Sequence, residues 1–224
     1  MTVPLSSVVL LVLTLACYPA VARPPSEEAL TAAGATVKKN HVGGIVELRF
    51  NGQAVDREIL AALPTLPALT SLILAGTDGD DRALVPIGKI TALKNLDLRE
   101  CASLDDSALE PVGKLTSLER LNLWRVPVGD VGITHLASLV RLRWLNLDNT
   151  LLSDAGLKAL SGMKNFEFLH VGSTAVSNAG IDRLAAVPTL QEVHLARTAV
   201  DTQGSGALKK QLPDARVIVQ AVGD

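Results

Sequence analysis

Two histidines, His170 and His194, lie 24 residues apart and form the pair in this sequence best suited to chemistry. Imidazoles bind zinc or act as general bases, and Asp148 or Glu192 could supply a third metal ligand. Such a site requires both side chains on one face of neighbouring strands, about 5 Å apart. A metal-dependent enzyme is therefore one hypothesis. A ladder of stacked polar side chains is the other interpretation of this spacing, with the members Asn122, Asn146, His170 and His194.

Aromatic and basic side chains form a second candidate set. Tryptophan and arginine are enriched at the energetic centres of protein interfaces, so these residues predict a partner-binding surface. Tryptophan faces also stack on sugars, which keeps a carbohydrate or cell-envelope binder as an alternative. A third interpretation is that the rings only cover one another and the surface beneath them. The set consists of Trp124, Trp144, Phe168, Arg99, Arg120 and Arg125.

The two cysteines exclude a disulfide-stapled scaffold. Cys101 occupies a position at which the sequence repeats a small residue about every 24 positions, and we expect its thiol to be buried instead of catalytic. The motifs H-E-x-x-H, G-x-S-x-G and C-x-x-C do not occur. We therefore expect no enzymatic activity and no cofactor. The repeated position comprises Thr77, Cys101, Val126, Thr150, Thr174 and Thr198.

The composition is that of a folded chain with a sizeable core. Of 224 residues, 48% are hydrophobic and 20% are charged, which excludes general disorder. The net charge is -2, so there is no basic surplus of the kind that nucleic-acid binders carry. Aromatic residues make up only 3% of the chain, which points to a repetitive core built from aliphatic side chains.

The first 22 residues predict a targeting segment. Residues 1–22 carry no charged side chain, and 8–16 form an apolar run too short to span a bilayer. The small-x-small pattern at 20–22 predicts cleavage before Arg23, as in a secretory signal peptide. We expect an exported protein in the periplasm, at the cell surface or secreted. A competing interpretation treats Cys17 as a lipobox cysteine, and only lipidation there would tether the chain to a membrane.

The pattern L-x-x-L-x-L recurs at intervals of 24, 24, 25, 24, 24 and 24 residues. Its starts are Ile45, Leu69, Leu93, Leu118, Leu142, Phe166 and Leu190. A fixed period in this range is typical of a repeat architecture, and residues 45–212 resemble leucine-rich repeat proteins. The second half of each repeat, T-x-V-S-D-x-G-L-x-x-L, is similar to that of exported bacterial leucine-rich repeat proteins. It also resembles the repeats of F-box adaptors. The predicted signal peptide argues against the latter.

The resemblance implies an α/β fold, a right-handed solenoid with a parallel sheet on its concave face and short helices on its convex face. The alternation of apolar residues before each turn fits a strand with one buried face. One column predicts helix N-caps, at Asp56, Asp80, Asp105, Ser153, Ser177 and Asp201. A second column predicts close approach between neighbouring helices, at Gly132, Gly156, Gly180 and Gly204.

The repeat pattern and its flanks divide the chain into four segments. Residues 1–22 are the signal peptide, 23–44 an N-terminal cap, 45–212 the seven repeats and 213–224 a C-terminal cap strand. The caps are needed because an open solenoid end exposes its core. The leading functional hypothesis is a non-catalytic exported domain that binds a protein or peptide on its concave face. The sites expected to carry this are the aromatic and basic set together with Asn122, Asn146, His170 and His194.

Overall fold

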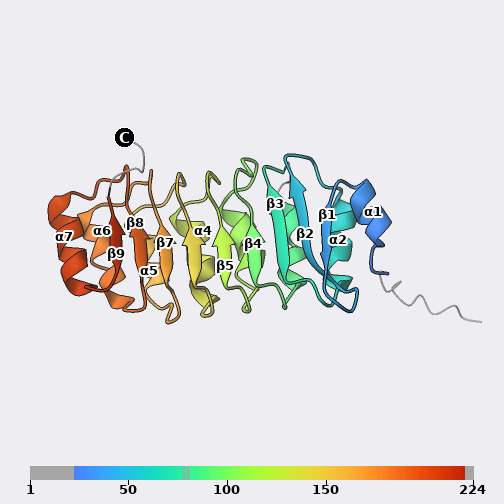
Figure 1. Ribbon diagram of the computed structural model, residues 1–224. Coiled ribbons are helices and arrows are strands. Elements are labelled where there is room, and N and C mark those ends of the chain that lie inside the picture. Colours follow the sequence, from blue (N-terminus) through green and yellow to red (C-terminus); the bar gives the residue numbers. More distant parts are fainter. Residues whose placement is uncertain (1–22, 78, 80, 220–224) are drawn as a thin grey trace, which may run out of the picture.

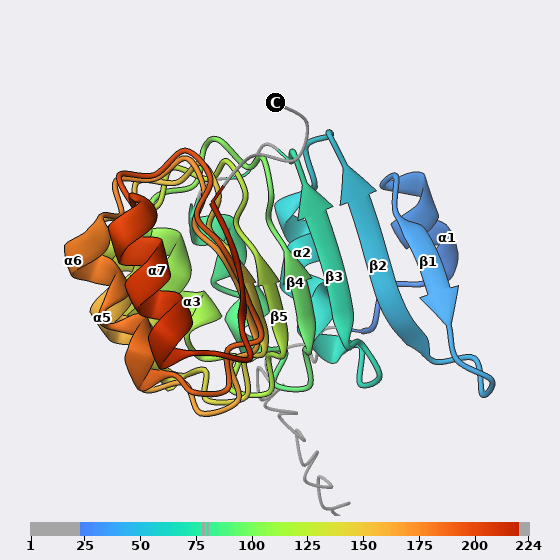
Figure 2. The same cartoon turned by 60° about the vertical axis from the view of Figure 1, so that its left-hand side comes forward.

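The computed structural model describes residues 23–77, 79 and 81–219. The predicted signal peptide and Cys17 therefore lie outside the described residues. The described strands form one sheet in which they follow chain order from β1 to β9. The sheet forms one layer and the helices lie together behind it (Figures 1 and 2). The sheet surface that points away from the helices, predicted from the sequence to be concave, is called the sheet face below.

The N-terminal end begins with a short helix and an antiparallel strand. Ser26 caps α1 (Glu27–Ala32) by accepting a hydrogen bond from Ala29 N. β1 (Thr36–Lys39) then pairs antiparallel with β2 (Ile45–Asn51). Lysines on β1 face outward at the edge of the sheet, which disfavours edge-to-edge pairing.

The remaining strands pair parallel, with one strand per repeat. Their register places residues about 24 positions apart side by side, so side chains of one sequence column become neighbours on the sheet. These strands are β3 (Ser71–Ala75), β4 (Asn95–Asp97), β5 (Arg120–Asn122), β6 (Trp144–Asn146), β7 (Phe168–His170), β8 (Glu192–His194) and β9 (Arg216–Ile218).

Helices of one to three turns cover the other side of the sheet. The α-helices after α1 are α2 (Arg57–Ala62), α3 (Leu109–Val112), α4 (Asp130–Thr134), α5 (Leu157–Leu160), α6 (Asn178–Ile181) and α7 (Thr202–Gln211). The 3-10 helices are η1 (Leu63–Thr65), η2 (Asp81–Leu84), η3 (Ile87–Lys89), η4 (Asp106–Ala108), η5 (His135–Ser138) and η6 (Leu184–Ala186). No helix of the described residues is long and apolar enough to cross a membrane.

The core lies between the sheet and the helices and consists mostly of aliphatic side chains. Leu145 of β6 and Leu157 of α5 are both fully buried, as the repeat pattern predicts. Phe50 and Phe166 are also fully buried, so two of the rings belong to the core and not to the surface. The fold is therefore the expected α/β repeat solenoid.

Side chains cap several helix starts, as predicted. Ser153 departs from the pattern, because its hydroxyl accepts from Ala155 N in the turn that precedes α5. Asp80 lies outside the described residues. The caps that accept a hydrogen bond from a backbone N–H of the first turn are Asp56 (α2), Asp105 (η4), Ser177 (α6) and Asp201 (α7).

An acidic column beside these caps joins each repeat to the next. Asp130 accepts hydrogen bonds from Ser153 N (2.8 Å), Ser153 Oγ (2.5 Å) and Gly156 N (3.0 Å). Each of the other members likewise accepts from a backbone N–H of the following repeat. This column is called the aspartate ladder, and its members are Asp81, Asp106, Asp130, Asp154 and Asn178.

The glycine column marks a close approach, as predicted, but the approaching group is a side chain of the aspartate ladder. A Cβ atom added to Gly132, Gly156, Gly180 or Gly204 would lie closer than 3.0 Å to a side-chain oxygen of the preceding repeat. Real Cβ atoms do not approach that closely, so glycine is required for the ladder to reach the backbone. Asp106, Asp130 and Asn178 are the first residues of η4, α4 and α6, so the predicted close approach between neighbouring helices is confirmed, and the ladder side chains make the contact.

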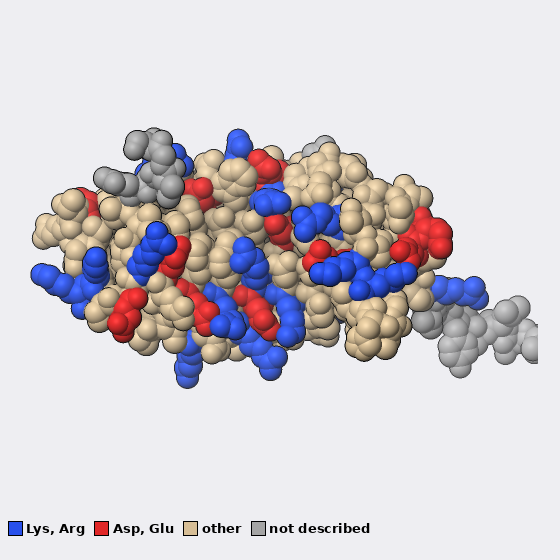
Figure 3. Space-filling model, viewed as in Figure 1, with Lys and Arg blue, Asp and Glu red and all other residues tan. Residues whose placement is uncertain are grey.

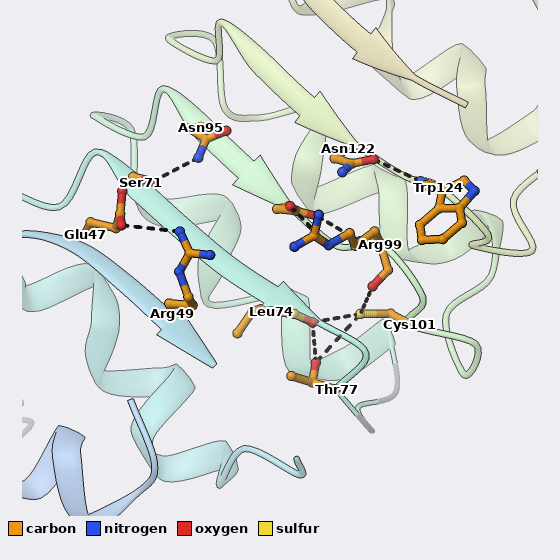
Figure 4. Close-up of polar contacts among 11 residues, drawn as sticks. Glu47, Arg49, Ser71, Leu74, Thr77, Asn95, Arg99, Cys101, Asn122 and Trp124 are labelled. Carbon is orange, nitrogen blue, oxygen red and sulfur yellow. Dashed lines mark hydrogen bonds and ion pairs between the residues drawn. The ribbon is translucent and has the colours of Figure 1, made fainter. Parts of the chain in front are cut away.

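The small residue after each strand is turned inward. Thr150 Oγ1 donates to Leu147 O (2.8 Å), and Thr77 Oγ1 makes the same bond to Leu74 O (2.9 Å). Cys101 is buried, and its thiol donates to Leu74 O in the preceding repeat (3.0 Å). Burial raises the pKa of the Cys101 thiol, which keeps it protonated and unreactive. Figure 4 shows these contacts of Thr77 and Cys101.

Candidate binding surface on the sheet

Four side chains on the sheet face stack along the solenoid. The rings of Trp144 and Phe168 are nearly parallel, at 9°, with centroids 4.9 Å apart. Arg120 Cζ lies 3.3 Å from the centroid of the Trp144 ring, and the His194 ring lies 5.2 Å from the Phe168 ring. Strand register explains the order, because Trp144 is the direct partner of both Arg120 and Phe168. These four residues are called the aromatic stack.

Both faces of the Trp144 ring are covered. β5 and β7 flank β6 on opposite sides, so Arg120 covers one face of the ring and Phe168 covers the other. A sugar that stacked on Trp144 would have to displace one of them. The stack therefore presents ring edges and a guanidinium group outward, a surface more typical of a protein interface than of a sugar platform.

Trp124 lies apart from the aromatic stack. Its ring is accompanied by Arg125, whose Cζ is 5.5 Å from the ring centroid. Among the described residues no ring contact joins Trp124 to Trp144. The two tryptophans do not contact one another, because Trp124 lies in the turn after β5, whereas Trp144 begins β6 and has Phe168 as its direct neighbour.

The three arginines of the candidate set have different surroundings. Arg99 Nε lies 3.6 Å from Asp97 Oδ2, so this arginine is paired with a carboxylate beside it. Arg125 Nη1 lies 3.3 Å from Glu100 Oε1 of the preceding repeat. Arg120 has no ion pair or hydrogen bond within the part of the chain that the structure describes. Arg120 is thus held only by Trp144.

The polar column on the sheet face consists of Asn122, Asn146, His170 and His194. Three of its side chains accept a hydrogen bond from the backbone of the turn that follows their strand. Asn122 Oδ1 accepts from Trp124 N (3.2 Å), and Asn146 Oδ1 accepts from Asp148 N (2.9 Å). His170 Nδ1 takes the same role and accepts from Gly172 N (3.3 Å). Figure 4 shows the Asn122 contact. The ladder interpretation is confirmed for the stacking of the two histidines, whereas Asn122, Asn146 and His170 accept hydrogen bonds from their own backbone and not from one another.

The two histidines are stacked, with ring centroids 4.6 Å apart and planes at 15°. His194 Nε2 donates to Glu192 Oε1 (2.5 Å), whereas His170 Nδ1 is engaged by a backbone N–H. Burial lowers the pKa of His170, and the charges of His194 and Arg197 add to this against the opposing effect of Asp148. Within the described residues no three His, Cys, Asp or Glu side chains are grouped so as to hold a metal ion.

One oxygen beside the histidines has no partner. Asp148 Oδ1 is buried and accepts no hydrogen bond within the described part of the chain, and it lies 3.9 Å from His170 Nδ1. A side chain in place of Gly172 would collide with both Asp148 and His170, so glycine allows this close arrangement. A buried acceptor without a donor costs free energy.

Charged side chains of both signs are spread over this surface. Basic and acidic groups alternate on the face shown in Figure 3, which is viewed from the same side as Figure 1. Several are paired across repeats, such as Arg143 with Glu167 (2.6 Å) and Lys94 with Glu119 (3.0 Å). A mixed surface of this kind does not attract a polyanion such as a nucleic acid.

Sequence reasoning missed three features of these columns. The aspartate ladder was visible as acidic or amide residues at intervals of about 24, directly after the cap column. His194 contacts Phe168 although the two residues belong to different columns of the repeat, and the sequence pattern does not predict this contact. The residues that follow the strands share a left-handed backbone, with φ between 52° and 64°, at Gly52, Gly76, Glu100, Arg125, Asn149, Ser173 and Arg197.

No family model matches the sequence, and no curated protein is significantly similar to it. Solved structures do resemble it. Internalin C2 of Listeria monocytogenes has a TM-score of 0.64 at 21% identity, over 86% of this chain and 91% of that chain. The leucine-rich repeat ectodomain of the Arabidopsis thaliana receptor kinase GASSHO1/SCHENGEN3, solved in complex with CASPARIAN STRIP INTEGRITY FACTOR 2, has a TM-score of 0.59 at 15% identity. That match covers 88% of this chain and 27% of the ectodomain.

The yeast complex of Rad7 and Elc1 matches with a TM-score of 0.61 at 22% identity, over 74% of this chain and 46% of the chain matched. At these identities the similarity establishes the fold. Together with the one-strand-per-repeat sheet and the buried leucine columns, it shows that this chain folds as a leucine-rich repeat solenoid.

Proposed function

We propose that the chain is a non-catalytic domain that binds a protein or peptide on its concave sheet face, with the aromatic stack as the centre of contact. The observation that carries the proposal is the ordered row of Arg120, Trp144 and Phe168 on a sheet surface that no helix covers. Tryptophan and arginine are the residues most enriched at interface hot spots. Two of the structural relatives were solved in complex with a peptide factor or another protein, which supports the same function.

The stack is suited to binding because its side chains are already ordered. Trp144 is fixed between two neighbours and Phe168 between two rings, so little rotamer entropy remains to be lost on association. The leucine core does not include these rings, since Trp144 and Phe168 are only partly buried. Rings that the core does not need are available for contact with a partner.

Export of the chain is part of the proposal. It rests on the apolar run at 8–16 and the small-x-small pattern at 20–22. N-terminal sequencing and intact mass of the exported protein test it, with Arg23 as the expected first residue. A start at Cys17 with added lipid mass would instead place the protein at a membrane surface.

The two alternatives have less support. A carbohydrate binder needs an open ring face, and Trp144 offers none, which leaves Trp124 as the ring for a sugar. A metal-dependent enzyme at His170 and His194 needs a third ligand, and within the described residues no three His, Cys, Asp or Glu side chains are grouped so as to hold a metal ion. No observation favours either alternative over peptide binding.

Selection of random linear peptides on the purified protein tests the proposed function. Peptides that bind wild type should bind Trp144→Ala and Phe168→Ala at least tenfold more weakly, the scale of about 1.4 kcal/mol or more. Lys158→Ala, an exposed position of α5 behind the sheet, is the matched control and should bind normally. Peptides whose affinity is unchanged by both ring substitutions would contradict the proposal, and a glycan array run in parallel tests the carbohydrate alternative.

A further inference from the structure

Arg120 differs from the arginines around it in having no anionic partner. On the sheet face Arg99, Arg125 and Arg216 each have a carboxylate oxygen within 3.7 Å. Within the described residues Arg120 has neither an ion pair nor a hydrogen bond, and its guanidinium contacts the Trp144 ring. No carboxylate within the described residues lies in contact with its positive charge, and Asp97 acts on it only from a longer distance.

Stacking leaves the hydrogen-bonding edge of a guanidinium group free. The five N–H donors of arginine lie in the plane of the group, and contact with a ring uses only its face. Arg120 Cζ lies over the Trp144 ring, and this contact consumes none of the donors of the guanidinium group. A planar fork of donors matches the two oxygens of a carboxylate.

Two amide groups lie next to Arg120 on the same surface. Asn122 is two residues away on β5, about 7 Å along the strand, and Asn146 is its partner on β6. Their Oδ1 atoms accept backbone N–H groups, which fixes the orientation of both amides. Within the described residues neither Nδ2 has a hydrogen-bond partner. The three side chains together carry N–H donors that have no hydrogen-bond acceptor within the described residues.

We propose that Arg120, Asn122 and Asn146 form a carboxylate-binding anchor that receives an acidic residue of the bound peptide. The proposal rests on the proposed function and deepens it by naming the chemistry of the ligand. The carboxylate comes from an Asp or Glu side chain or from the peptide C-terminus, since the same donors fit either source. The ring edges of Trp144 and Phe168 then contact the apolar residues beside the acidic one.

The charges around the anchor favour one carboxylate over a polyanion. Asp97 acts electrostatically on Arg120, and Asp148 follows Asn146 on the same repeat. One further negative charge neutralises the free guanidinium, whereas a chain of phosphates would also face these two carboxylates. The anchor thus selects a singly charged group within an otherwise mixed surface.

Peptides selected on wild-type protein from a random linear library provide the probe. Asp or Glu should be enriched at one position, and replacement by Asn or Gln should weaken binding about tenfold. The same replacement should change binding to Arg120→Gln very little. Arg216→Gln, at the equivalent position of β9, is the control and should retain the full effect of the acidic residue. Amidation of the peptide C-terminus distinguishes a terminal carboxylate from a side-chain one.

The outcomes separate this inference from the proposed function. Peptides that require Trp144 and Phe168 but bind equally well without any carboxylate would overturn the anchor and leave peptide binding in place. Failure to select any peptide would overturn both. Thermal unfolding of Arg120→Gln and Arg120→Lys confirms that each variant is folded, and Arg120→Lys should recover little affinity because an ammonium group lacks the planar fork.

Discussion

The aspartate ladder and the aromatic stack are two columns of the same repeat that use their side chains differently. In the ladder, Asp130 accepts three hydrogen bonds from the following repeat, so its acceptor capacity is used inside the fold. In the stack, Arg120 and Trp144 hold one another, yet the donors of Arg120 have no partner among the described residues. The hydrogen-bonding groups of the ladder are satisfied within the protein, whereas the guanidinium donors of the stack remain available to a ligand.

The difference shows that periodicity alone does not distinguish a structural column from a binding one. Both columns recur at intervals of about 24 residues, and both place side chains of neighbouring repeats in contact. The distinguishing property is whether the hydrogen-bonding groups are satisfied within the chain. By that criterion the ladder contributes stability and the stack contributes recognition.

The largest expected effect is on stability, from the ladder. Asp130→Ala should lower the free energy of unfolding by about 3 kcal/mol, because it leaves two backbone N–H groups and a hydroxyl without their acceptor. Asp182→Ala, an exposed acidic position after α6, should be nearly neutral. Chemical denaturation of both variants measures this. Equal losses for the two would remove the structural role assigned to the ladder.

A smaller effect is expected from coupling within the stack. A double-mutant cycle on Trp144→Ala and Phe168→Ala should give a coupling free energy of about 1 kcal/mol in unfolding, because the two rings are in contact. The cycle on Trp124→Ala and Trp144→Ala should be additive, since these rings do not touch. Coupling of the second pair as strong as that of the first would break the distinction between the stack and Trp124.

The smallest effect concerns pH. Burial lowers the pKa of His170 from its ordinary value of 6.5, so the unfolded chain takes up a proton first as the pH falls. The contribution of His170 to stability is therefore fully present above about pH 6.5 and decreases as the solution becomes more acidic. His170→Asn retains an acceptor for Gly172 N without titrating, as Asn146 does for Asp148.

Denaturation midpoints of wild type and His170→Asn at neutral and mildly acidic pH measure this contribution. Wild type should lose more stability than the variant over that interval. The same loss in both proteins would show that His170 does not carry this pH dependence.

The repeat fold and its columns could be predicted because the 24-residue period and the alternation of apolar residues fix the strand register. The sequence therefore identified the buried position of Cys101 and the sheet-face position of Trp144. The partner of each ring could not be predicted in the same way. Trp124 lies in the turn after β5, whereas Trp144 is the first residue of β6, so the two rings belong to different columns of the repeat.

The contacts of the aspartate ladder could not be predicted from the sequence either, for a different reason. The 24-residue spacing marks the column, but acidic residues in the first turn of a helix are expected from the helix dipole alone, so the position of Asp130 does not indicate a link between repeats. Its contacts with Ser153 and Gly156 depend on how far one repeat is offset from the next, which only the structure gives. The missing partner of Arg120 is likewise a property of packing and not of residue type.

Stability and affinity measured on the same two variants test the separation of the two columns most directly. For one selected peptide, Trp144→Ala should weaken binding by about 2 kcal/mol while lowering the free energy of unfolding by about 1 kcal/mol at most. Asp130→Ala, kept at a temperature where it is folded, should bind the peptide as wild type does. Normal binding by Trp144→Ala, or a loss of affinity in Asp130→Ala as large as its loss of stability, would contradict that separation.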